Sequence, residues 1–188
     1  MRPYFLLIIF IIISCKPSIK MSDKSLVLDV LNNYIKKDSL YGGHISPNLL
    51  PYFYYPTQYS DDGHEIPPPP ISHEGEHLDE SKIAERVGIS RYISKFDADH
   101  IKYQLIKSKD ISSSFRGMRF STNIQRKGKG DIDSGYVLYV PIFNRDSSAA
   151  YVQYDFYVDL FNGQGNGAVL VKQNGKWQMI KWLDRWIN

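Results

Sequence analysis

The chain has little cysteine: Cys15 is the only one among its 188 residues, and one residue separates it from the longest apolar run. A single cysteine cannot form an intrachain disulfide, so the folded part must be held together by its core. No G-x-S-x-G segment occurs, which excludes the nucleophile elbow of serine hydrolases.

The chain also lacks a strong net charge. Its formal charge is +3, and removal of a leader that contains Arg2 brings the remainder close to neutral. Nucleic-acid binding depends on a clustered positive charge, so we expect no nucleic-acid partner. Hydrophobic residues make up 43% of the chain, a content typical of a folded domain.

No apolar run is long enough to span a bilayer. Tyr4 to Ile13 form an apolar stretch, whereas a transmembrane helix needs about 20 residues. A short apolar run after Arg2 is typical of a signal peptide. It ends in Ile12-Ile13-Ser14-Cys15, which resembles a bacterial lipobox. The resemblance implies cleavage before Cys15 and acylation of that residue.

We therefore predict a signal peptide over residues 1–14, a lipidated Cys15 with a tether over 15–21, and one domain over 22–188. The alternative is an ordinary cleaved signal peptide that happens to contain a cysteine. Two or more acyl chains give stable membrane attachment, which makes the membrane an expected partner. Lys16 follows the cysteine. By resemblance to the sorting rule of Gram-negative lipoproteins, this residue favours the outer membrane.

The pattern predicts an α+β fold, with N-terminal helices packed on a curved C-terminal antiparallel sheet of at least four strands. Apolar spacing and capping residues predict helices over 22–38, over 81–87 and from Asp97, the last with an apolar stripe of Ile101, Leu105 and Ile106. Residues 112–120 are predicted as a strand, followed by a basic loop over 126–130.

The C-terminal third carries the clearest strand signals. Residues 136–143 and 149–160 are predicted strands, and the second alternates in a half-buried pattern. The glycine-rich residues 162–167 are predicted as a turn. Asn174-Gly175 predicts a two-residue hairpin into a strand over 176–187.

The segments YVPIFNRDSSAAYVQYDFYV and NGKWQMIKWLDRWIN resemble the C-terminal half of small bacterial lipoproteins of unassigned function. More loosely, their patterning is similar to folds of the nuclear-transport-factor-2-like or cystatin-like type. The resemblance implies a helix packed on a curved sheet, which can enclose a pocket, and implies no activity.

Two aromatic groups are candidate binding surfaces. Residues 47–59 contain prolines that exclude a helix or a central strand, so we expect an irregular flap there. Its candidate contact residues are Tyr52, Tyr54 and Tyr55. Tyr151 and Tyr157 lie on the predicted outer face of the strand over 149–160. Residues 61–80 are acidic and rich in proline and histidine, and we expect an exposed loop.

Residues 73–77 spell H-E-x-x-H, the zincin signature. On a helix, His73 and His77 would bind zinc and Glu74 would polarise the attacking water. Glu80 or Glu85 are candidate third ligands. Gly75 and Glu76 fit that helix poorly, so a solvated acidic loop without a metal is the favoured interpretation.

The leading hypothesis is a lipid-anchored cell-envelope protein that acts as a non-enzymatic binding or accessory module, with an unidentified protein or small-molecule partner and no cofactor. The first alternative is a zinc-dependent hydrolase that uses residues 73–77. The second, by analogy with small lipoproteins, is an immunity-type protein that protects the envelope from a toxin.

Overall fold

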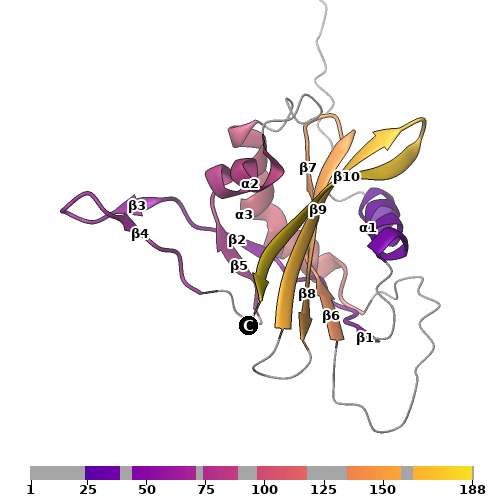
Figure 1. Ribbon diagram of the computed structural model, residues 1–188, viewed down its shortest axis with the longest axis horizontal. Coiled ribbons are helices and arrows are strands. Elements are labelled where there is room, and N and C mark those ends of the chain that lie inside the picture. The colour runs from indigo at the N-terminus through magenta and orange to yellow at the C-terminus, as the bar shows by residue number, and fades with distance from the viewer. Residues whose placement is uncertain are drawn as a thin grey trace, which may run out of the picture.

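A sheet with helices on both faces organises the chain in the computed structural model, which describes residues 24–38, 44–70, 74–88, 97–117, 135–157 and 163–187 (Figure 1). The predicted leader, Cys15, the tether, His73 and the basic loop over 126–130 lie outside these ranges. Of the helices described, none is both long and apolar enough to cross a membrane.

The predicted α+β class is confirmed. The described helices are α1 (Lys24–Asp38), α2 (Glu80–Val87) and α3 (Ala98–Ser114). The main sheet runs in the order β1-β6-β8-β9-β10, with β7 paired to β8, and is antiparallel except where β1 joins β6. Its strands are β1 (His44–Ile45), β6 (Gly135–Leu138), β7 (Ile142–Phe143), β8 (Ala149–Tyr157), β9 (Gly163–Gln173) and β10 (Lys176–Ile187).

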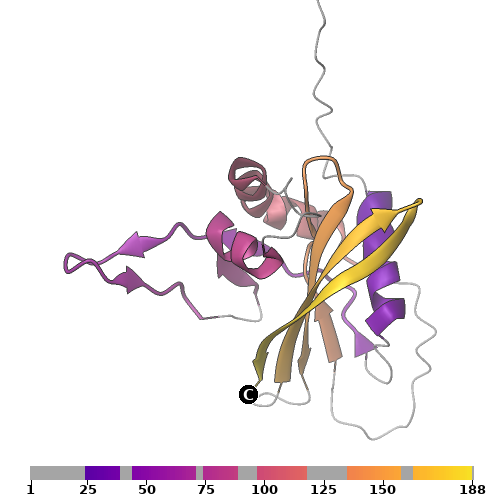
Figure 2. The same ribbon diagram turned by 45° about the horizontal axis from the view of Figure 1, so that its top comes forward.

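Four shorter strands lie outside this sheet. β2 (Tyr52–Tyr54) and β5 (Glu76–Leu78) form a parallel pair, and β3 (Gln58–Tyr59) pairs antiparallel with β4 (Glu65–Ile66). Figures 1 and 2 show α1 on one face of the sheet, and α2 and α3 with the β2–β5 pair on the other. Residues 55–70, which contain β3 and β4, extend away from this body, and we call them the arm.

Strand β8 is buried on both faces, which corrects the predicted half-buried pattern. Ala150, Val152 and Tyr154 pack in the core beneath α1. Tyr151 faces a second core that contains residues of β2, β5, α2 and α3. Because the β2–β5 layer covers the face that was expected to meet solvent, every residue from Ala149 to Asp155 is buried.

Helix α3 is longer than predicted. Asp97 caps it as expected, because its side chain accepts a hydrogen bond from the His100 backbone N–H at 2.7 Å. The strand predicted from Ser112 is wrong over residues 112–114, which are helical. Phe115, directly after the last residue of α3, is fully buried in the core beneath α1 and holds the C-terminal turn of that helix. The predicted stripe is wrong at Ile106, whose side chain is 53% exposed.

Gln104 joins α3 to the sheet as a neighbouring strand would. Its Nε2 donates to the Phe143 carbonyl at 2.6 Å, and its Oε1 accepts from the Phe143 N–H at 2.7 Å. Both backbone groups of Phe143 are thus satisfied by one buried amide, as buried backbone groups require. A polar residue on the buried stripe of α3 therefore fixes where the helix lies along β7.

The glycine-rich segment is a strand and not the predicted turn. Gly163 to Gly167 pair with Tyr157 to Gln153 along β8. A Cβ on Gly167 would lie 3.0 Å from the Tyr151 hydroxyl and 3.1 Å from its ring, so this glycine gives space to that ring. The hairpin predicted at Asn174-Gly175 is confirmed, with φ of 51° and 77°.

Candidate functional site

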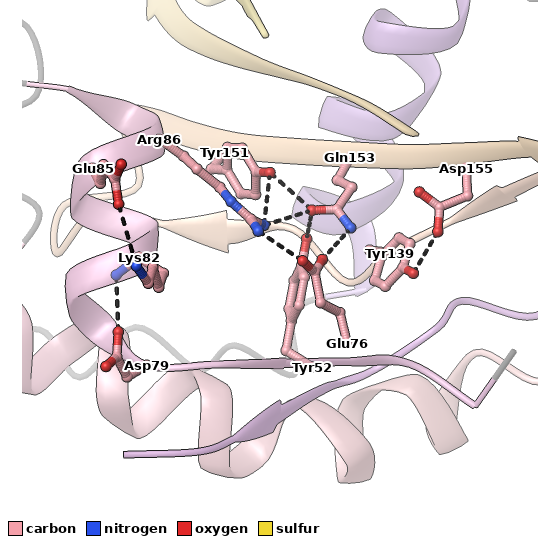
Figure 3. Close-up of polar contacts among 10 residues, drawn as sticks. All are labelled: Tyr52, Glu76, Asp79, Lys82, Glu85, Arg86, Tyr139, Tyr151, Gln153 and Asp155. Carbon is pink, nitrogen blue, oxygen red and sulfur yellow. Dashed lines mark hydrogen bonds and ion pairs between the residues drawn. The ribbon is translucent and has the colours of Figure 1, made fainter. Parts of the chain in front are cut away.

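A buried polar network connects the main sheet to the layer that covers it (Figure 3). Its members come from four elements: Tyr52 from β2, Glu76 from β5, Arg86 from α2, and Tyr151 and Gln153 from β8. β2, the adjacent β5 and α2, and β8 come from three separate parts of the sequence, and their polar side chains converge where apolar packing would be expected. Buried polar groups of this kind require partners, and the network supplies them.

The centre of the network is an ion pair between Arg86 and Glu76. The Arg86 Nη2 donates to Glu76 Oε1 at 2.7 Å; the Glu76 side chain is 4% exposed and that of Arg86 24%. Burial acts to lower the pKa of Arg86, but the Tyr151 hydroxyl and the Glu76 carboxylate raise it above its usual value. Arg86 is therefore a fixed cation, and Glu76 is its counter-ion.

Gln153 connects this ion pair to strand β8 of the main sheet. Its Nε2 donates to the second carboxylate oxygen of Glu76 at 2.7 Å. Its Oε1 accepts from the hydroxyls of Tyr151 at 2.8 Å and Tyr52 at 3.1 Å, and from Arg86 Nη1 at 3.4 Å. An amide oxygen with three donors is saturated, so the network holds elements together and offers little to a ligand.

A second buried carboxylate lies farther along β8. Asp155 is fully buried and accepts a hydrogen bond from the Tyr139 hydroxyl at 2.6 Å. The Tyr139 ring stacks on Tyr52, with ring centroids 5.2 Å apart and planes inclined by 23°. This stack places the two polar groups side by side beneath the same layer.

A shallow hollow lies where the arm joins the body. It encloses about 230 Å³, including space open to solvent, between arm residues, β5 and the start of α2. The closed part of this space holds little more than one water molecule. It is therefore a groove between two parts of the chain, far smaller than the roughly 300–1,000 Å³ of a site for a drug-sized ligand. It is lined by Tyr55, Thr57, Glu65, Ile66, Pro68, His77, Leu78, Asp79 and Lys82.

Asp79 fixes the geometry of this hollow. Its side chain caps α2 by accepting from the Lys82 backbone N–H at 2.9 Å, and it also accepts from the Ser81 hydroxyl at 2.6 Å and from the Thr57 hydroxyl. Burial acts to raise the pKa of Asp79, but these hydrogen bonds from Ser81, Thr57 and Lys82 lower it below its usual value. The ionised form of Asp79 thus joins the arm to α2.

The H-E-x-x-H segment does not have the helix that zincin chemistry needs. Residues 76–78 form strand β5, Gly75 has a φ of 145°, and His73 lies outside the described residues. His77 packs between Phe53 and Tyr55, with ring centroids 5.1 Å and 6.2 Å away. Glu74 is exposed. Within the described ranges, no three His, Cys, Asp or Glu side chains are grouped so as to hold a metal ion.

The expected exposed loop over residues 61–80 divides into two parts. Residues 61–69 are exposed except for the half-buried Pro68, as expected, but Glu76 and Asp79 are only 3% and 6% exposed. The expectation is wrong for the second part because β5 pairs with β2 and its carboxylates have partners. An acidic segment can therefore be buried where a cation such as Arg86 lies opposite its carboxylates.

The predicted aromatic contact residues fall in different environments. Tyr151 and Tyr52 are buried, at 0% and 1% exposure, which corrects their assignment to a contact surface. Tyr54, Tyr55 and Tyr157 are half-buried. Sequence reasoning missed Glu76, Arg86 and Gln153 as a unit. The available signal was the polar pair Gln153 and Asp155 between Tyr151 and Tyr157 on one strand face.

We predict that the Glu76–Arg86 pair is strongly coupled. Glu76→Gln leaves a buried cation without its counter-ion, and we expect a loss of about 2–4 kcal/mol in the free energy of unfolding, as for broken buried pairs. Arg86→Met should cost a similar amount. The double variant should lose much less than the sum, measured by urea unfolding in a double-mutant cycle.

The control for this cycle is the exposed Lys82–Glu85 pair on the same helix, 3.8 Å apart. Glu85→Gln should cost under about 1 kcal/mol, because exposed pairs contribute little. If the Glu76–Arg86 coupling is as small as that of the control, the ion pair is not the centre of the network.

We predict a pH-dependent contribution from Asp79. Because its pKa is lower in the folded state than in the unfolded chain, its stabilisation is complete above the unfolded pKa, about 4. It is lost as the pH falls through the folded value. Wild type should therefore be more stable than Asp79→Asn near neutrality, and the difference should shrink in acid. Unfolding free energies measured from pH 7 down to pH 3 check this.

Asp61→Asn, an equal change of charge at an exposed arm residue, serves as the control. A gap between wild type and Asp79→Asn that stays constant or widens in acid contradicts the assignment.

Comparisons of the chain with protein-family models, with curated proteins and with solved structures gave no match. The resemblance to small lipoproteins and to nuclear-transport-factor-2-like or cystatin-like folds stays a prediction. A functional proposal for this chain rests on its leader and on the geometry of the described residues.

Proposed function

We propose that the chain is a lipid-anchored cell-envelope protein that acts as a binding or accessory module and meets its partner through the arm. The lipobox-like leader over residues 12–15 supports anchoring and export. The observation that carries the binding role is the arm itself, which extends from the body (Figure 1) and exposes Tyr59 and Ile66.

The arm has no core of its own. Its strands β3 and β4 are two residues long, and isolated hairpins are at best marginally stable. Tyr59 is 67% exposed and Ile66 38%. The arm is held at its base, where the Tyr55 N–H donates to the Leu78 carbonyl at 2.9 Å and Lys82 pairs with Glu65 at 3.7 Å. A projecting hairpin that keeps apolar groups in solvent is typical of a contact segment.

The negative charge of the arm and the residues around it indicates what kind of surface a partner would have. Residues 52–88 contain eight Asp and Glu against two Lys and Arg, a formal charge of −6, in a chain whose total is +3. Asp61, Asp62 and Glu65 are exposed on the arm beside Tyr59. A partner surface with basic side chains around an apolar patch complements this arrangement, because such complementarity speeds encounter and selects against wrong partners.

Anchoring predicts that Cys15 carries the acyl chains. Cells grown with an alkyne analogue of palmitate should label the wild-type chain, and Cys15→Ala should remove the label and release the protein from the membrane fraction. Acylation needs the cysteine sulfur, so Cys15→Ser should behave like the alanine variant. Equal labelling of wild type and Cys15→Ala contradicts anchoring at this residue.

The arm proposal predicts a position-specific cross-link. A photoreactive benzoyl-phenylalanine in place of Tyr59 should give a discrete protein adduct on illumination of intact envelopes. Tyr103, 54% exposed on α3, is the matched control position and should give no such adduct. Asp61→Lys with Asp62→Lys should reduce the adduct yield at least about fivefold, since complementary charges steer encounter. Equal adducts from both positions, or no effect of the charge reversal, contradict a role of the arm.

A further inference from the structure

The outer face of α3 combines apolar and basic side chains. Tyr103 and Ile106 are 54% and 53% exposed, and their spacing of three places them side by side on the helix. Lys102, Lys107 and Lys109 are exposed around them. Asp99 and Asp110 lie on the same exposed surface, and Lys107 pairs with Asp110 at 3.4 Å. Lys102 Nζ lies 5.0 Å from the centre of the Tyr54 ring, so the outer face has three other cations, Lys107, Lys109 and Arg116, and two carboxylates.

The start of the described domain lies beside the end of this helix. Lys24, the first residue of α1, donates from its Nζ to the Ser114 carbonyl at 2.8 Å and lies 5.7 Å from the centre of the Phe115 ring. Eight residues, 16–23, separate Lys24 from Cys15. Even fully extended, such a segment spans less than about 30 Å. The anchor therefore reaches the domain at the C-terminal end of α3.

We propose that the outer face of α3 lies on the anionic surface of the bilayer that holds the Cys15 lipid. This inference rests on the proposed anchoring. It deepens that proposal by assigning which face of the domain meets the membrane. Interfacial helices of this kind bury their aromatic and aliphatic groups at the headgroup level, while lysines extend to anionic headgroups. Each lysine near such a surface contributes attraction that falls off within a Debye length.

The distribution of charge favours a bilayer over a second copy of the chain. Residues 52–88 carry a formal charge of −6, and the rest of the chain carries the compensating positive charge. An anionic surface attracts the exposed lysines of α3 and repels the exposed carboxylates of the arm. A second copy would offer α3 the acidic side chains of its narrow arm, whereas an anionic bilayer extends beneath the whole face of the helix.

The test uses the full lipidated chain, extracted in detergent and reconstituted into vesicles of phosphatidylethanolamine with phosphatidylglycerol. Acylation would leave no free thiol on the parent chain, so single-cysteine variants accept one fluorophore each. Ser113→Cys probes the outer face of α3, Lys176→Cys the β9–β10 turn and Asp62→Cys the tip of the arm; all three residues are exposed. Quenching by a spin-labelled lipid measures proximity to the bilayer.

We expect strong quenching at position 113 and at least about tenfold less at 62 and 176, because the quencher acts only at the membrane surface, which the proposal places against α3. Adding Lys109→Glu should reduce quenching at 113 severalfold. Lys176→Glu, the matched charge reversal, should leave quenching at 113 unchanged. Replacing phosphatidylglycerol by phosphatidylcholine should have the effect of Lys109→Glu.

Equal quenching at the three positions, or quenching at 113 that ignores lipid charge, overturns the proposal. A signal at 113 that depends on protein concentration and not on the quencher assigns this face to a second copy instead. Failure of the anchor is distinguishable, because the parent chain would then take up the thiol-reactive fluorophore at Cys15.

Discussion

The buried ion pair between Glu76 and Arg86 is the interaction on which the arrangement of the domain depends. Glu76 is on a three-residue strand and Arg86 on an eight-residue helix. Elements this short bury little apolar area of their own. Gln153 and Tyr151 receive this pair on the central strand of the sheet, so the position of the covering layer is set by polar geometry as much as by packing. A fixed cation inside a domain tolerates one counter-ion position, which makes the packing specific.

That constraint explains why β8 is buried on both faces. A strand that alternates apolar residues with Tyr151, Gln153 and Asp155 predicts one solvent-facing side, and the local pattern does not indicate what covers that side. The covering layer comes from residues 52–54, 76–88 and 98–111, of which the first strands lie in a segment that looks irregular and acidic. The apolar core of this layer forms only where Tyr52, Leu78 and Ile83 contact Tyr151 and Val169. Long-range packing thus overrides local pattern.

Sequence signals that act over a few residues predicted the corresponding helices and turn correctly. Asp97, the Asn174-Gly175 turn and the apolar spacing of α1 each act within a few residues, and the structure confirms the elements they mark. Errors arose where a distant partner decides the outcome. Glycines that look like a turn lie in a strand because Gly167 gives space to Tyr151, 16 residues earlier. The network of Glu76, Arg86 and Gln153 could not be predicted, because their pairing depends on how three elements meet.

The charged residues that form the buried network belong to a chain whose exposed acidic and basic residues lie in different segments. Two carboxylates of the acidic residues 52–88 are buried with partners: Glu76 pairs with Arg86, and Asp79 caps α2. Asp61, Asp62 and Glu65 are exposed on the arm. Three exposed lysines, Lys102, Lys107 and Lys109, lie along α3, and Lys24 bonds to Ser114 at the C-terminal end of that helix. A domain held to an anionic surface by a chain entering at its basic side has one electrostatically favoured orientation. That surface would repel the acidic arm, so one charge distribution is compatible with both the anchoring and the partner binding that we propose.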